Sequence, residues 1–361
     1  MKLEVGLQIH LPTYASTPLS DLLGLARAAA GAEFDQIWVT DNLGSRSPFV
    51  VLAALAGTVP TKLGAAVMNQ YLRSPVEAAR ALLVLGELME GRELTVGLGS
   101  GNPFTDRLIS RRRPITFLRE TLTALAALLA GEELAIGGLP LLMEYFGFAA
   151  EARVELPAPA TRDQIHLYGG GNGPKSLSVA GELADGVLVG WTLLPLVRLG
   201  RLATVLQTAD GSARAVGRSR PRRVGEIKIS VDRDHRRARE FVRTKAESAA
   251  QRSLSLRRRG YDDADLRLLG IDPVDVDSIE RAVRAGHDHG DLSAFVSDGM
   301  IDACFIAGDP TYCRERLTEV AEVATRNGVH QLMFSELGPD PPESLRLIAD
   351  QIWPDLLDRA R

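Results

Sequence analysis

Cysteine is scarce in this chain, and neither a long apolar run nor a strong net charge is present. The 361 residues include two cysteines, Cys304 and Cys313, and carry a formal net charge of -4. Two cysteines cannot form a disulfide framework, and no metal-ligand spacing surrounds them, so we expect two buried, inert thiols and no metal. The small negative charge argues against a dedicated nucleic-acid binder.

The sequence also lacks the marks of a membrane or exported protein. No apolar stretch is long enough to span a bilayer, so we expect no membrane contact. The N-terminus enters a strand at once, without the charged leader and apolar run of an export signal. We therefore expect a cytoplasmic protein.

The two common phosphate-binding motifs are missing as well, although one glycine-rich segment comes near both. Residues 165–168 are predicted to form a buried strand, residues 169–173 a turn, and Pro174 suits the first position of a helix. A dinucleotide fingerprint requires glycine where Pro174 stands, and a P-loop requires Gly-Lys-Ser/Thr where this chain has Pro174, Lys175 and Ser176. Residues 186–189 form the next strand, so the segment is a βαβ crossover with an unusual turn.

This turn is nevertheless the predicted centre of the protein. Glycines let the backbone approach a ligand closely, and the amides at the start of the following helix point at that ligand with the positive end of the helix dipole. We predict that an anion, in particular a phosphate, binds here. The residues concerned are Gly169, Gly170, Gly171, Asn172, Gly173, Pro174 and Lys175. A glycine-rich turn with no ligand is the structural alternative.

Strand and helix patterns alternate along most of the chain, which predicts a parallel sheet with crossover helices. The predicted strands cover residues 3–11, 36–40, 62–68, 93–99, 165–168, 186–189, 224–231 and 329–334. Ser74, Pro75 and Glu77 form a capping box that opens a helix ending at Met89. Eight strands alternating with helices indicate an α/β protein with a (β/α)8 TIM barrel, whose chemistry lies at the carboxyl ends of the strands.

Residues 137–161 and 232–298 depart from this alternation. Residues 137–161 are predicted to be irregular, while residues 194–207 and 341–357 are each predicted to form one helix. Residues 232–298 are helical by composition and are interpreted as an insertion before the eighth strand that covers the mouth of the barrel. The whole chain, residues 1–361, is then a single domain.

Several motifs in the same order resemble the luciferase-like monooxygenase superfamily, and within it the branch of the F420-dependent methylenetetrahydromethanopterin reductases. The similar segments are residues 62–77, 86–92, 97–102, 168–186, 306–310 and 338–340. The resemblance covers nearly the whole chain. It implies the deazaflavin coenzyme F420 as cofactor, with FMN as the alternative.

The resemblance also implies where that cofactor lies. Its ring would stack on the bulged third strand at Ala65, Ala66 and Val67, with a cis peptide bond between Ala66 and Val67. Asp41 would be a polar contact near the ring, although a helix cap or turn residue is an equal reading of Asp41. The remaining chain of the cofactor would pass Asn69, Gly99, Ser100 and Asn102.

Departures from the branch bear on the substrate. Gln8, Asn42 and Asn102 stand where the methanopterin reductases carry acidic or imidazole side chains, and an amide cannot act as a general acid. His10 and Tyr14 are the remaining candidates to protonate a substrate, with Asp41 and Tyr71 behind them, although a lone histidine is more often structural. The predicted substrate pocket consists of Gln8, Asn42, Tyr71 and Tyr145.

The predicted function is an F420H2-dependent reductase that transfers a hydride to an activated C=C, C=N or C=O bond of a small-molecule or natural-product substrate. An FMN-dependent monooxygenase and a non-catalytic barrel subunit are the alternatives. The resemblance implies a homodimer formed through helices near the second and third strands. The apolar residues 49–55 and 78–89 are compatible with this contact, and equally with ordinary core packing.

Overall fold

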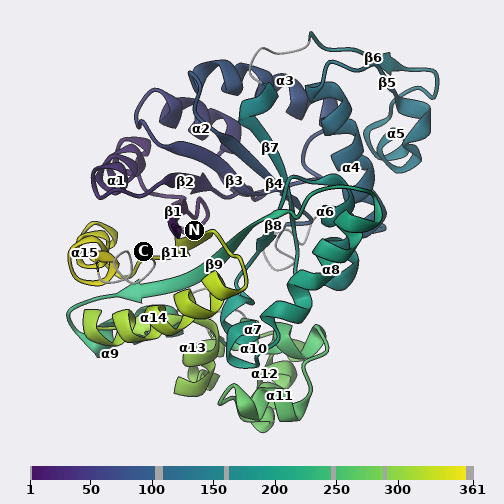
Figure 1. The fold of residues 1–361 in the computed structure, drawn as a ribbon. Coiled ribbons are helices and arrows are strands. Elements are labelled where there is room, and N and C mark those ends of the chain that lie inside the picture. The colour runs from purple at the N-terminus through teal and green to yellow at the C-terminus, as the bar shows by residue number, and fades with distance from the viewer. Residues whose placement is uncertain (1, 102–108, 158–161, 245–248, 288–290, 355–361) are drawn as a thin grey trace. The chain divides into compact units, whose positions relative to one another are not determined.

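The computed structural model describes residues 2–101, 109–157, 162–244, 249–287 and 291–354 (Figure 1). The chain divides into two compact units. The N-terminal unit consists of residues 6–188 and 205–224, and the C-terminal unit of residues 1–5, 189–204 and 225–361. Three of the divisions between the units fall within strands.

The sheet has the strand order of a closed (β/α)8 barrel, as predicted. Its eight barrel strands are β1 (Glu4–Ile9), β2 (Gln36–Val39), β3 (Lys62–Asn69), β4 (Leu94–Gly99), β7 (Ile165–Gly170), β8 (Gly186–Val189), β9 (Arg222–Val231) and β11 (Gln331–Ser335). They pair in the order β9-β11-β1-β2-β3-β4-β7-β8, and β8 pairs again with β9. A further strand, β10 (Ile306–Gly308), runs parallel to β9 and was not predicted.

Helices follow the strands where the sequence pattern placed them. The helices of regular crossovers are α1 (Leu19–Gly31), α2 (Pro48–Ala56), α3 (Pro75–Leu88), α4 (Pro114–Leu129), α6 (Pro174–Leu183), α14 (Pro310–Arg326) and α15 (Pro341–Leu347). At the start of α3 the Ser74 hydroxyl accepts a hydrogen bond from the Glu77 amide at 3.2 Å, which confirms this part of the predicted cap. A π-helix, η4 (Ile348–Ile352), follows α15.

Two predicted segments differ from the structure. Residues 194–207 form two helices, α7 (Leu193–Arg198) and α8 (Leu202–Ala215), because Gly200 adopts a left-handed φ of 66° between them. The segment predicted to be irregular contains α5 (Pro140–Phe146), flanked by the antiparallel strands β5 (Leu134–Ala135) and β6 (Arg153–Val154). Glu120 of α4 explains the helix, since its carboxylate accepts from the Leu141 and Leu142 amides at 2.9 and 3.0 Å.

The helical insertion before the last barrel strand is confirmed. Its helices are α9 (His235–Arg243), α10 (Ala249–Arg258), α11 (Asp263–Leu268), α12 (Pro273–Arg284) and α13 (Asp298–Cys304), with a 3-10 turn, η3 (Asp291–Phe295), before α13. They share a core that includes the buried side chains of Leu254, Ile279 and Met300, and Figure 1 shows α10 to α13 close together. That this segment covers the barrel mouth, and that the chain is one domain, stay predictions.

Arg92, the last residue of one of the motifs, ties the ends of two helices together. Its guanidinium donates hydrogen bonds to the carbonyls of Ala56, Val59 and Met89 at 2.9, 2.6 and 2.8 Å. These carbonyls lie at the carboxyl ends of α2 and α3, where backbone oxygens lack intrahelical donors. A single side chain thus terminates both helices beside β3.

Both thiols are buried, as predicted. Cys304 and Cys313 are free cysteines with no exposed surface. Burial raises the pKa of the Cys304 thiol to about 12 and raises the pKa of Cys313 further still. Both therefore stay protonated near neutral pH.

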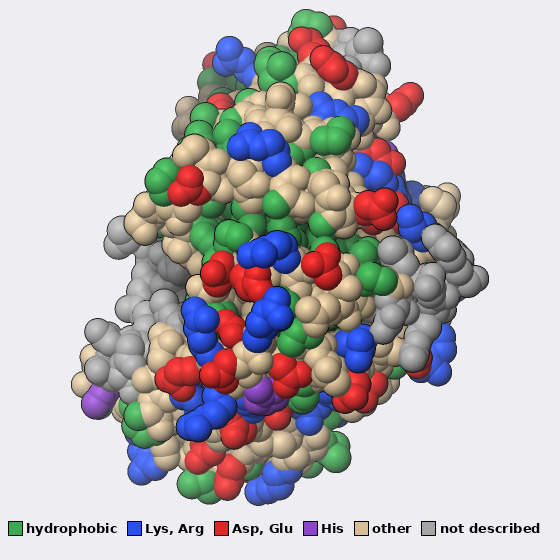
Figure 2. All heavy atoms as spheres, turned by 90° about the vertical axis from the view of Figure 1, so that its left-hand side faces the viewer, with side chains coloured by type: hydrophobic (Ala, Val, Ile, Leu, Met, Phe, Trp, Pro, Cys, Tyr) green, Lys and Arg blue, Asp and Glu red, His purple; other side chains and the backbone are tan. Residues whose placement is uncertain are grey.

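The described helices include none that is long and apolar enough to cross a membrane. On the face drawn in Figure 2, basic and acidic side chains are interleaved instead of gathering by sign. Ion pairs such as Arg233 with Glu343 and Arg257 with Asp263 show the same mixing at short range.

Candidate active site

The third strand carries the most unusual backbone of the site. The peptide bond between Ala66 and Val67 is cis, as the resemblance implied, and the pairing of β3 with β4 shifts register between Ala65 and Met68. Gln8 of β1 donates from its Nε2 to the Ala66 carbonyl at 2.8 Å. The side-chain amide of Gln8 therefore supports the bulge.

Val67 lies between Gly99 of β4 and Gly170 of β7. A Cβ at Gly99 would be 2.9 Å from Val67 Cγ2, and a Cβ at Gly170 would be 2.5 Å from Val67 Cγ1. Both glycines leave room for this valine, since a larger residue would overlap with it. Val67 is partly exposed while Ala65 and Ala66 beside it are buried, so it presents an apolar surface at the bulge.

Glycines in the turn after β7 also leave room for neighbouring atoms that a side chain would displace. A Cβ at Gly169 would lie 2.4 Å from Ala180 Cβ of α6, and a Cβ at Gly171 would lie 2.4 Å from Ser176 Oγ. The Gly171 amide donates to the Leu188 carbonyl at 3.3 Å, which ties the turn to β8. The glycines thus bring the turn directly against the start of α6.

The N-terminus of α6 is the strongest anion site that the sequence pattern predicted. Gly173 occupies the N-cap and Pro174 the first turn, as expected, and Pro174 has no amide hydrogen. Ser176 Oγ donates to the Gly173 carbonyl at 2.9 Å, and Lys175 is exposed. The amides of Lys175 and Ser176 stand at the positive end of the helix dipole, an arrangement that suits a phosphate. Asn172 is half-buried in the turn.

Asp41 is held by an ion pair. Its carboxylate is 1% exposed and pairs with both terminal nitrogens of Arg73, and Asp41 Oδ2 also accepts from the Asn69 amide at 3.0 Å. The Asn69 side-chain oxygen in turn accepts from the Tyr71 amide at 3.1 Å. Asp41 therefore fixes the end of β3 to the end of β2, which is a positioning arrangement.

His10 and Tyr14 lie in one short loop after β1. Both are buried, each with 8% of its surface exposed. His10 Nδ1 lies 2.7 Å from Thr13 Oγ1, which orients the imidazole ring. The Tyr14 carbonyl accepts from Arg46 at 2.9 Å. Asn42 is also buried, and its carbonyl accepts from the Ser45 amide at 3.1 Å.

Tyr71 and Tyr145 are brought together in an aromatic cluster. Their ring centroids are 5.7 Å apart, and Phe117 lies 4.3 Å from Tyr71 and 5.2 Å from Tyr145. The Tyr71 hydroxyl donates to the Arg112 carbonyl at 3.1 Å, and burial raises the pKa of this phenol. Tyr145 keeps 38% of its surface exposed. The cluster is therefore an apolar surface in which the Tyr145 ring is accessible to solvent.

The turn after β4 is only partly described. The Ser100 carbonyl accepts from Arg111 Nε at 2.7 Å, so Arg111 holds this turn. Arg112 lies 3.6 Å from Glu144 in an exposed ion pair. Asn102, predicted to border the cofactor, falls outside the described residues.

The described residues of the predicted site all belong to the N-terminal unit. Asp41, Asn69, Gly99 and Gly170 lie at the carboxyl ends of β2, β3, β4 and β7, and Asn69 pairs with Gly99 in register. This is the end of a barrel where ligands bind. Among the described residues, no group of three or more His, Cys, Asp or Glu side chains could hold a metal ion.

Two polar features escaped the sequence-based prediction. Arg73 lies in residues 62–77, one of the segments similar to the family, but was not part of the predicted site, although it pairs with Asp41. In the C-terminal unit Lys228 Nζ lies 3.1 Å from both Glu226 Oε1 and Glu336 Oε1, and Lys228 is 4% exposed. Glu226 and Lys228 are two residues apart in an otherwise apolar strand. Side chains at this spacing lie on the same face of a strand, so the sequence could have predicted one polar face here.

Comparisons with known proteins agree over nearly the full length. A family model described as luciferase-like monooxygenase matches residues 1–327. The chain is 32% identical over 344 residues to a 5,10-methylenetetrahydromethanopterin reductase of Methanolobus tindarius, covering 93% of this chain and 97% of the relative. It is 27% identical over 369 residues to an F420-dependent glucose-6-phosphate dehydrogenase of Beutenbergia cavernae, covering 94% of each.

A solved structure has the same fold. The coenzyme F420-dependent tetrahydromethanopterin reductase from Methanopyrus kandleri superposes with a TM-score of 0.76 at 23% identity, covering 99% of this chain and 100% of that chain. At this identity the likeness establishes the fold. It agrees with the strand order of a (β/α)8 barrel.

Proposed function

The chain belongs to the luciferase-like monooxygenase family, and from this premise we propose that it is an oxidoreductase that uses coenzyme F420. The proposed reaction is hydride transfer from the reduced deazaflavin to an activated C=C, C=N or C=O bond of a small-molecule or natural-product substrate. Two relatives named as F420-dependent glucose-6-phosphate dehydrogenases, each matched over 94% of this chain, support the cofactor.

The observation that carries the proposal is the turn at the start of α6. Gly171 could not carry a side chain without overlapping Ser176, and the two amides after Pro174 stand at the positive helix end. These residues fit the phosphate of a nucleotide-like cofactor. When bound, the deazaflavin would supply a hydride at its C5.

The chain's own residues would place the reactants. Val67, with Ala65 and Ala66 beside it, would support the cofactor ring, and the small residues at Gly99 and Gly170 keep that surface in place. The contacts of Asp41 with Arg73 and the Asn69 amide would fix the end of β3 under the ring. Placement of this kind lowers the barrier without chemistry by the protein.

A proton must reach the substrate after the hydride arrives, and we propose His10 or Tyr14 as its donor. Both lie in the loop at the carboxyl end of β1 and are largely shielded from water. The contact of His10 with Thr13 Oγ1 orients one ring nitrogen. Asp41, bound to Arg73, is the weaker candidate because an ion-paired carboxylate has no proton to donate.

The test is a titration of the purified apoprotein with oxidised F420 and, separately, with FMN, followed by protein fluorescence or equilibrium dialysis. We expect tight binding of F420 alone. Gly171→Ala should weaken it by at least about tenfold, ~1.4 kcal/mol, because the new Cβ would displace Ser176. Gly138→Ala is the matched control, since nothing lies within 4 Å of its Cβ position. Preferential binding of FMN would favour an oxygen-dependent monooxygenase. Binding of neither F420 nor FMN would favour a non-catalytic barrel.

We also propose a homodimer. Val50 of α2 and Val84 and Leu88 of α3 are exposed by 65%, 57% and 45%, so these adjacent helices present apolar side chains that a second copy could cover. Sedimentation equilibrium tests this, and a monomer at micromolar concentration would contradict it.

A further inference from the structure

A cavity of about 510 Å³ lies between α7, α13 and α14 of the C-terminal unit. This volume is in the range of small-molecule sites. Its polar lining consists of Arg198, Asp302, Tyr312, Arg316 and Glu319, and three valines form the rest. None of these residues belongs to the glycine turn, so the inference below is independent of the proposed cofactor.

Two guanidinium groups share the cavity. The Arg198 side chain is exposed at the rim of the cavity, and partial desolvation followed by the positive charge of Arg316 lowers the pKa of its guanidinium. In the described part of the chain, Arg198 has no carboxylate within 4.0 Å, whereas Arg316 pairs with Glu319, whose side chain is 64% exposed. An exposed pair of that kind is weak and is readily exchanged for another anion.

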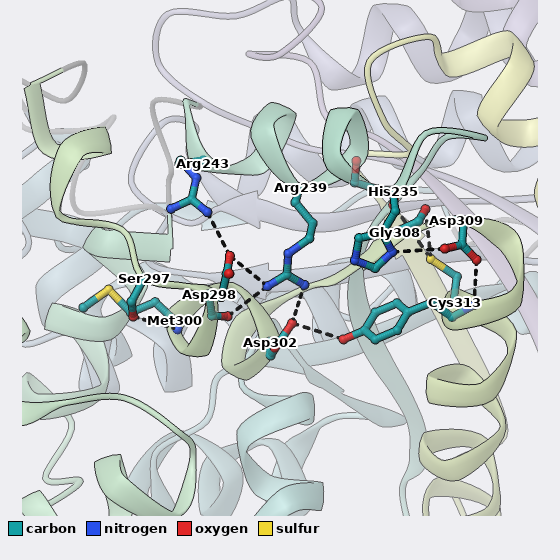
Figure 3. A network of polar contacts seen from close by, with 12 residues as sticks. His235, Arg239, Arg243, Ser297, Asp298, Met300, Asp302, Gly308, Asp309 and Cys313 are labelled. Carbon is teal, nitrogen blue, oxygen red and sulfur yellow. Dashed lines mark hydrogen bonds and ion pairs between the residues drawn. The ribbon is translucent and has the colours of Figure 1, made fainter.

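Asp302, one of the two acidic side chains of the lining, already has hydrogen-bond partners. Asp302 Oδ1 accepts from Arg239 Nη1 at 2.7 Å and from the Tyr312 hydroxyl at 3.1 Å. Figure 3 shows Arg239 between Asp302 and Asp298, and Arg239 also lies 3.1 Å from Asp298. The network joins α9, α13 and α14, so the cavity wall is preformed. The charge of Asp302 favours the Arg198 cation, but its Oδ1 already accepts from Arg239 and Tyr312.

We propose that this cavity binds a small organic phosphate. The phosphate would sit between Arg198 and Arg316, because planar guanidinium groups bind phosphate oxygens through paired hydrogen bonds. The cavity is larger than one phosphate, and the organic part would rest on Val320 and Val323 of α14. Anion binding would also relieve the repulsion between the two cations.

The experiment is calorimetric titration of the full chain with inorganic phosphate and with phenyl phosphate, at constant ionic strength set by chloride. The Gly171→Ala background separates this site from the glycine turn. In it we expect phenyl phosphate to bind more tightly than phosphate, and Arg198→Gln and Arg316→Gln each to weaken binding by about tenfold or more. Arg326→Gln is the control, since Arg326 is exposed on the same helix and contacts only a backbone carbonyl among described residues.

Equal affinity of Arg198→Gln, Arg316→Gln and Arg326→Gln for phenyl phosphate would overturn the proposal. So would loss of all phosphate binding in Gly171→Ala alone, which would assign the anion to the glycine turn. If F420 does not bind but phosphate binding still depends on Arg198 and Arg316, the proposed cofactor is refuted and the proposed phosphate site in this cavity is supported. The two arginines are tested separately, so a folding defect in one variant does not decide the outcome.

Discussion

The packing of Val67 between two glycines predicts a strong coupling between positions 67 and 170. Gly170→Ala would place a Cβ 2.5 Å from Val67 Cγ1 and 3.1 Å from the Leu98 carbonyl. Overpacking of this kind costs ~1–3 kcal/mol of unfolding free energy. Val67→Ala removes two methyl groups at a partly exposed position, so we expect it to cost about 1 kcal/mol alone.

In the double variant the new Cβ meets an alanine, and the Leu98 carbonyl is the remaining close neighbour. The double variant should therefore be hardly less stable than Val67→Ala, with a coupling of about 1–2 kcal/mol. Denaturant unfolding of the four proteins measures this cycle, and Gly138→Ala should stay within ~0.5 kcal/mol of the parent. Additive losses at positions 67 and 170 would refute the packing argument, as would a neutral Gly170→Ala.

Two further predictions concern ion pairs. Asp41→Asn should lower the unfolding free energy by roughly 3 kcal/mol, because it leaves the 17% exposed Arg73 side chain without its carboxylate partner. Denaturant unfolding measures this loss, and a loss below ~0.5 kcal/mol would contradict the prediction. Hydrogen bonds from Arg201 hold the pKa of Asp265 below its ordinary value, so the pair stabilises the fold above about pH 4 and loses that effect as the pH falls through the folded-state pKa. The stability difference between the parent and Arg201→Gln should thus be largest near neutral pH and shrink in acid, and a pH-independent difference would count against this linkage.

Local patterns in the sequence were sufficient for the barrel but not for the irregular parts. The alternation of strands and helices, the capping residues of α3 and the Pro174 start of α6 are all short-range signals, and each is confirmed. The break at Gly200 and the helix α5 were missed, because one depends on a single left-handed glycine and the other on the carboxylate of Glu120, which is 21 residues before Leu141.

Contacts between distant residues explain what could not be predicted in the site. The motif around the third strand indicated the cis peptide, but no local pattern shows that Gln8 binds the Ala66 carbonyl or that Arg73 reaches Asp41. Lys228 and Glu336 are 108 residues apart and meet only in the folded chain. The roles of His10, Tyr14 and Asp41 in catalysis stay predictions.

The position of Arg92 has a consequence for how relatives of this protein are recognised. Its motif ends in an arginine that, among the described residues, donates hydrogen bonds to backbone carbonyls at the ends of α2 and α3 and in the loop before β3. Such a residue is selected by the geometry of two helices, whatever the barrel binds. A match at Arg92 is therefore a record of shared architecture, and differences in chemistry between relatives must be sought in side chains such as Gln8 and His10 that face the strand ends.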